Sequence, residues 1–206
     1  MPKQTGGRTT DTRQLILKEA EKLYYTGGYD HINLQVLADQ LHITKAALFH
    51  HFKNKACLFF ETLLAILEHM RQMFEAVIAQ GDPSTRARLM RAMEQLALEP
   101  AFDIVRFQRE EMKVLDPQQQ QEIRQAWSAG TFDIVKRIFQ EGMLQGDLKE
   151  HDATMAASLF LNICLLLPRA SDPVRTLPMH ESRDLYITNM LSMLLDGLGR
   201  PVSGVP

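Results

Sequence analysis

The sequence predicts an all-α protein of about nine helices. Apolar residues recur at intervals of three and four, β-branched residues are scattered, and proline and glycine fall at regular breaks between the periodic segments. Apolar residues make up 45% of the 206 residues and charged residues 23%, which is typical of folded globular chains. This length allows one large domain or two small ones.

The first helix is predicted over residues 12–26. Its apolar residues form a stripe at helical spacing, and the pair Gly27-Gly28 is typical of a helix C-terminus. Residues 29–32 are expected to be extended and to lead into Asn33, a favourable N-cap for the next helix.

Two short helices follow, with a tight turn between them. Apolar residues at i, i+3, i+4 and i+7 place the second helix from Leu34 to Leu41, and Thr44 is an N-cap for a third helix from Lys45 to about His51. Such a pair predicts a helix-turn-helix. The predicted core of the pair is Leu37, Leu41, Ile43, Leu48 and Phe52. The outward residues of the third helix are Lys45, Ala46, Ala47, Phe49 and His50.

A long helix is predicted from Lys55 to the break at Gly81-Asp82-Pro83, and it is long enough to join two domains. Further breaks predict helices near residues 84–98, 101–115, 118–145, 152–167 and 180–197. The expected domains are a head over residues 1–55, a helical bundle over residues 56–200 and a flexible tail over residues 201–206.

The charge is divided unevenly between these domains. Residues 1–55 hold eight Lys/Arg against five Asp/Glu, whereas residues 56–206 hold fifteen against twenty. A basic head points to an anionic partner such as DNA only if it also has a shape that reads a groove. The chain has no apolar stretch long enough to span a bilayer and no secretory signal pattern, so a cytoplasmic protein is expected.

The sequence contains no pattern of catalytic or metal-binding residues. Cys57 and Cys164 are far apart and lack neighbours at metal-ligand spacing. His50 and His51 diverge by about 100° on a helix, so they cannot chelate one ion together. Nucleophile-elbow and phosphate-loop motifs are also missing. We therefore expect no enzyme, no cofactor and no metal.

Residues 12–58 resemble the DNA-binding domain of TetR-type (tetracycline-repressor-like) transcriptional regulators. The likeness lies in an ordered run of features. They are Arg13 to Tyr24 ending in Gly27-Gly28-Tyr29, then Leu37-Ala38 with Leu41, Ile43-Thr44-Lys45, Leu48-Phe49 with His51-Phe52, and finally Lys55 and Leu58. The stretch 138–148 is similar to the family helix that precedes its two dimerisation helices. The resemblance implies a palindromic double-stranded DNA operator, a homodimer and a small-molecule effector.

Three positions depart from the family pattern. His42 stands where a turn glycine is common, and Phe49 and Ala47 replace residues that often carry a hydroxyl. Histidine tolerates positive φ, and phosphate contacts then depend on the remaining polar groups and helix N-termini. The predicted DNA-binding residues are Asn33, Thr44, Lys45, Ala46, Ala47, Phe49, His50 and Lys55.

Polarizable methionines and aromatic residues in the bundle fit either an ordinary core or an adaptable apolar cavity. Under the second alternative the predicted ligand-binding residues are Met70, Met93, Phe102, Phe107, Met112, Trp127 and Phe132. A neighbouring group of charges, Arg106, Arg109, Glu110 and Glu111, is expected to form a charged helix face rather than a ligand clamp.

The last two helices are apolar over a wider face than a surface helix needs. In the family such helices pair across a two-fold axis. The predicted dimer residues are Leu159, Ile163, Leu166, Tyr186, Met190, Met193 and Leu194. The main hypothesis is a repressor released from its operator by an apolar or amphipathic effector. A helical carrier or enzyme for hydrophobic compounds, and a protein-binding adaptor, remain as alternatives.

Overall fold

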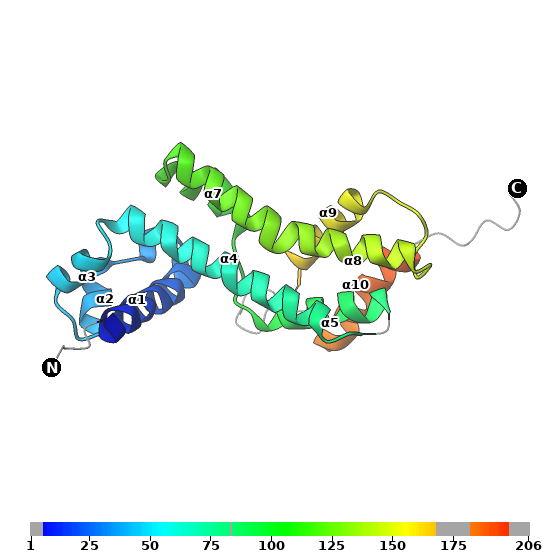
Figure 1. Ribbon diagram of the computed structural model, residues 1–206, viewed down its shortest axis with the longest axis horizontal. Helices are drawn as coiled ribbons and strands as arrows, with labels where there is room; N and C mark the ends of the chain where they lie inside the picture. Colours follow the sequence, from blue (N-terminus) through cyan, green and yellow to red (C-terminus); the bar gives the residue numbers. More distant parts are fainter. Residues whose placement is uncertain (1–5, 83, 168–181, 198–206) are drawn as a thin grey trace, which may run out of the picture. The chain divides into compact units, whose positions relative to one another are not determined.

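The computed structural model describes residues 6–82, 84–167 and 182–197, and all regular elements in these ranges are helical (Figure 1). The chain forms two compact units. The first unit consists of residues up to Met70 together with Phe102–Ser128, and the second consists of Arg71–Ala101 together with the residues from Ala129 onward.

The first unit begins with the N-terminal head, which we define as α1 (Gly6–Gly27), the 3-10 turn η1 (Tyr29–His31), α2 (Leu34–Gln40) and α3 (Lys45–His51). It also contains α4 (Lys55–Ala79) as far as Met70, α6 (Ile104–Arg109), the 3-10 turn η2 (Glu111–Val114) and α7 (Pro117–Trp127). The second and third helices lie where the sequence predicts them.

The second unit contains α5 (Thr85–Leu98), α8 (Asp133–Leu144), α9 (Ala153–Cys164) and α10 (Arg183–Asp196), with a π-helical turn, Ser128–Phe132, before α8. Helix α5 packs against both α8 and α10, and α8 packs against α9. The predicted tail, residues 201–206, and the first two residues of the predicted last helix lie outside the described residues. None of the described helices is long and apolar enough to cross a membrane.

Three predictions about the elements were wrong. Residues 29–32 are not extended, because Tyr29–His31 form a 3-10 turn closed by the Ile32 N–H donating to the Tyr29 carbonyl at 3.1 Å. The helix predicted over 101–115 is two elements that meet at Glu110. The helix predicted over 118–145 is interrupted by the π-helical turn.

Both interruptions follow from specific side-chain contacts. The Asp103 side chain caps the Arg106 N–H at 2.9 Å, which starts α6 late, and Glu111 then turns into the unit to meet buried partners. In the π-helical turn, a Cβ on Gly130 would lie 3.2 Å from the Arg71 Cβ, so the missing side chain permits this close approach. Such turns interrupt α-helices in short pieces.

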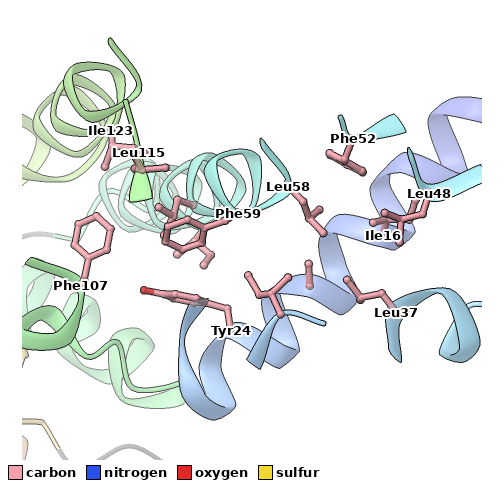
Figure 2. Packing of buried hydrophobic residues seen from close by; sticks show 14 of the residues in the cluster. Ile16, Tyr24, Leu37, Leu48, Phe52, Leu58, Phe59, Phe107, Leu115 and Ile123 are labelled. Atoms are coloured by element: carbon pink, nitrogen blue, oxygen red, sulfur yellow. The ribbon is translucent and has the colours of Figure 1, made fainter. Parts of the chain in front are cut away.

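One apolar core runs through the first unit. Ile16, Leu37 and Leu48 of the head are fully buried, and Phe59 of α4 continues the core toward residues from 102–128 (Figure 2). The distal end of this core is formed by Phe107, Leu115 and Ile123. The head therefore shares its core with segments far away in the sequence.

Candidate nucleic-acid interface

The two short helices are held by side-chain caps at their first turns. The Asn33 Oδ1 accepts from the Gln35 N–H at 2.9 Å and from the Val36 N–H at 3.3 Å, and the Thr44 Oγ1 accepts from the Ala47 N–H at 3.1 Å. Both predicted N-caps are confirmed. The Asn33 amide NH₂ and the Thr44 O–H proton are not used by these caps, so each can still donate to a phosphate oxygen.

The turn between the helices has the left-handed backbone that the sequence predicts at His42. Its φ is 52°, and it is the single non-glycine residue with positive φ in the described part of the chain. The turn is closed by the Ile43 N–H, which donates to the Ala38 carbonyl at 3.0 Å. Ala38 is 1% exposed, so a small residue lies where α2 approaches its neighbours.

Replacing His42 by glycine is expected to raise the free energy of unfolding by about 0.5–1 kcal/mol, because glycine adopts positive φ without the steric cost of a Cβ. Denaturant titration of the full chain measures this change. Gln40→Gly is the matched control, since that residue has ordinary helical geometry and is expected to lose about 0.5–1 kcal/mol. A loss of stability in both variants would contradict the assigned turn.

Helix α3 presents one buried face and one exposed face. Leu48 and the following Phe52 are fully buried, whereas Lys45, Ala46 and His50 are exposed. Ala47 is half-buried and Phe49 is 42% exposed, an unusual exposure for a phenylalanine. This outer face combines one cation, two methyl groups, an aromatic ring and an imidazole, which suits contact with phosphates and with thymine methyl groups.

Lys55 differs from the other predicted DNA contacts. Its Nζ lies 4.3 Å from the centre of the Tyr29 ring and donates to the Asp30 carbonyl at 3.3 Å, so this lysine joins η1 to the start of α4. Lys53 is exposed between α3 and α4 and was not among the predicted contacts. Its position directly after the third helix was the signal in the sequence that could have identified it.

The predicted ligand-binding residues are distributed over both units. Phe102 and Met112 pack against the core of the first unit, where Phe107 is 8% exposed. The same unit contains Met70 and Trp127, and the second unit contains the fully buried Met93 and the half-buried Phe132. A groove of about 480 Å³ in the second unit is lined by none of these seven residues. Its lining includes Met143, Met155, Leu159 and Leu194.

The predicted dimer residues remain accessible in the single chain. Leu159, Leu166 and Met193 are 49%, 57% and 51% exposed. The other four, Ile163, Tyr186, Met190 and Leu194, are half-buried. An apolar surface of this kind on two helices is typical of a surface that a partner covers.

The prediction of a charged helix face was wrong for Glu111. This residue is 4% exposed, and its carboxylate accepts hydrogen bonds from the Tyr24 hydroxyl at 2.9 Å, the Tyr29 N–H at 2.9 Å and the Arg106 Nε–H at 3.0 Å. We call Tyr24, Tyr29, Arg106 and Glu111 the Glu111 cluster. Burial and the neighbouring carboxylate hold the pKa of Tyr24 well above its usual range, so its hydroxyl stays protonated and donates.

Comparison with known proteins places this geometry in a family. A family model described as bacterial regulatory proteins, tetR family, matches residues 16–62. The uncharacterised HTH-type transcriptional regulator YhgD of Bacillus subtilis (strain 168) is 24% identical over 159 residues, which are 76% of this chain and 82% of YhgD.

Solved structures extend the likeness beyond the head. A transcriptional regulator of the TetR/AcrR family from Thermobifida fusca YX-ER1 is 26% identical with a TM-score of 0.65, over 92% of this chain and 100% of that one. AibR, solved in complex with isovaleryl coenzyme A and operator DNA, is 24% identical with a TM-score of 0.64, over 89% of this chain and 97% of AibR. Together with the helix-turn-helix geometry, these matches show a transcriptional regulator whose N-terminal residues 16–62 match the model of the bacterial regulatory proteins of the tetR family.

Proposed function

We propose that the chain is a cytoplasmic, homodimeric repressor that binds a palindromic operator and is released by an apolar or amphipathic effector. It acts by binding rather than by catalysis. Each subunit places α3 in the major groove, and the two copies of α3 enter successive grooves about 34–36 Å apart. The observation that carries this proposal is the exposed outer face of α3, held in place by the two caps and the buried Leu48.

Four kinds of contact are proposed for this face. Lys45 and Lys53 approach phosphates as exposed cations, and Asn33 and Thr44 donate from the groups that their caps leave available. Ala46, Ala47 and Phe49 contact thymine methyl groups, while His50 faces a base edge. Lys55 contributes its charge to the phosphate backbone from its position over Tyr29.

The proposed partner of the second unit is another copy of the chain. A dimer with a two-fold axis presents the same surface from each subunit, and it matches the symmetry of a palindromic site. Leu159 of α9, Leu166 just after α9 and Met193 of α10 are exposed and form a surface that such a pairing would bury. The effector proposal is supported by a protein of the same fold, AibR, whose structure contains both an acyl-coenzyme A and operator DNA. Five of the predicted ligand residues lie in the first unit and remain the proposed contacts: Met70, Phe102, Phe107, Met112 and Trp127.

Replacing Lys45 by alanine is expected to weaken binding to all duplexes and to lower the slope of log K against log salt by about 0.9, because one phosphate contact is lost. The probe is a duplex that the wild-type chain recovers from a random pool, and fluorescence anisotropy at several salt concentrations gives the slope. Lys149→Ala is the control, since Lys149 is an exposed lysine of the second unit. An unchanged slope for Lys45→Ala would refute the proposed contact.

A further inference from the structure

The strongest unexplained feature of the first unit is a buried carboxylate that touches the N-terminal head from outside it. Glu111 belongs to η2, and two of its three partners, Tyr24 and Tyr29, belong to α1 and η1. Burying a carboxylate is costly unless it is paired and hydrogen-bonded, and here both oxygens are used. Glu111 therefore joins η2 to the N-terminal head, and its carboxylate keeps all of its hydrogen bonds only while these two segments hold this relative position.

The contacts of Glu111 lead toward the DNA-facing residues of the head. Glu111 accepts a hydrogen bond from the N–H of Tyr29, the first residue of η1. The chain then continues from η1 through the fully buried Ile32 to Asn33, the N-cap of α2. The ring of Tyr29 also lies under the Lys55 ammonium, at the start of α4. The turn η1 is thus held by Glu111 and by Lys55, and it connects α1 to the helix-turn-helix.

The other side of the carboxylate is held by α6. The Arg106 Nε–H donates to Glu111, and its guanidinium lies 6.0 Å from the centre of the Tyr24 ring. A displacement of η2 would remove the acceptor from Tyr24 and from Tyr29, and it would leave Arg106 and Glu111 without their mutual charge pairing. A different orientation of the head relative to η2 therefore requires the loss of the hydrogen bonds from Tyr24 and Tyr29 to Glu111.

We propose that Glu111 is the positioning residue through which the α6–η2 segment controls the orientation of the N-terminal head on DNA. This inference rests on the proposed function. It assigns the control of operator affinity to a carboxylate that makes no contact with DNA itself. Movement of the α6–η2 segment, whatever its source, changes DNA affinity by making or breaking the two hydrogen bonds that Glu111 accepts from Tyr24 and Tyr29 of the head.

Glu111→Ala in the full chain is expected to weaken binding to the recovered duplex by about tenfold, in the range of typical coupling between sites. Tyr24→Phe keeps the buried ring and removes only the hydroxyl donor, so it is expected to weaken binding in the same direction. The matched control is Glu110→Ala, which removes the same charge from an exposed neighbour. Glu110→Ala should bind the duplex with the affinity of the wild-type chain. All variants should keep the wild-type slope of log K against log salt, because no phosphate contact is lost.

The measurements separate positioning from stability. Dissociation constants are determined well below the thermal midpoint of each variant, so that only folded protein is compared. A purely structural role would lower Tm and leave the dissociation constants of Glu111→Ala and Tyr24→Phe at the wild-type value, which would overturn the proposal. An equal loss of affinity in Glu110→Ala would also overturn it. If the wild-type chain recovers no duplex at all, the proposed function fails instead.

Discussion

Replacing Gly28 by alanine is expected to destabilise the first unit by about 2–4 kcal/mol and to weaken DNA binding. Gly28 has φ 75° and ψ −158°, a conformation that is essentially restricted to glycine. A Cβ at this position would also lie 2.5 Å from the Arg106 Nε and still closer to the Glu111 Oε1. Because both atoms belong to the Glu111 cluster, they cannot move away without losing hydrogen bonds.

Denaturant titration of the full chain tests this prediction, with amide exchange at Tyr29 as a local measure of the Glu111 contact. The control is Gly146→Ala. Gly146 also has positive φ, at 79°, but a Cβ there would meet no atom within 4 Å, so only the backbone strain of about 1–2 kcal/mol remains. If Gly28→Ala lowers the free energy of unfolding by no more than Gly146→Ala does, the close packing described around Glu111 is contradicted.

Introducing charges on α9 and on the residues directly after it is expected to abolish dimerisation and to lower operator affinity by about 10²–10⁴-fold, because the two heads no longer bind as a linked pair. The proposed variant is Leu159→Glu with Leu166→Glu, which places two carboxylates on a surface that the dimer would desolvate. Both leucines are about half exposed in the single chain, so the substitutions are expected to leave the fold of the subunit intact.

Sedimentation equilibrium gives the oligomeric state, and anisotropy with the recovered duplex gives the affinity. Leu144→Glu is the control, since Leu144 is 87% exposed on α8 and lies outside the predicted dimer surface. A double variant that remains dimeric, or a monomeric variant that keeps wild-type affinity, would contradict the assigned interface.

The parts of the interface that the sequence predicts correctly depend on local interactions. Asn33 and Thr44 cap the backbone of residues two or three positions later, and Leu37 and Leu48 follow helical periodicity. The positive φ of His42 is expected from the family resemblance, in which a turn glycine is common at this position. Each of these features can be recognised from a few neighbouring residues.

The parts that the sequence does not predict depend on distant partners. Glu111 is hydrogen-bonded to Tyr24, which is 87 residues away in the sequence. Lys55 lies over the ring of Tyr29, and the whole helix-turn-helix stands between these two residues in the sequence. The local sequence around Glu111 shows only a charged residue in a helical pattern, and the sequence around Lys55 shows only a lysine at the start of a helix. Neither pattern identifies the distant residue that the side chain contacts. Met93 shows a further limit, because a fully buried core methionine and a cavity methionine have the same local pattern.

The central claim is that α3 of each of two subunits lies in the major groove, and cleavage of DNA from a reagent attached to α3 tests it most directly. The chain would carry Cys57→Ser and Cys164→Ala, with an iron chelate coupled to the thiol of His50→Cys, since His50 is exposed on α3. We predict cleavage of the recovered duplex at two positions related by the two-fold symmetry of an inverted repeat, centred about 10–10.5 base pairs apart or a multiple of this distance. Cleavage at one position only, or outside the repeated half-sites, would contradict the account.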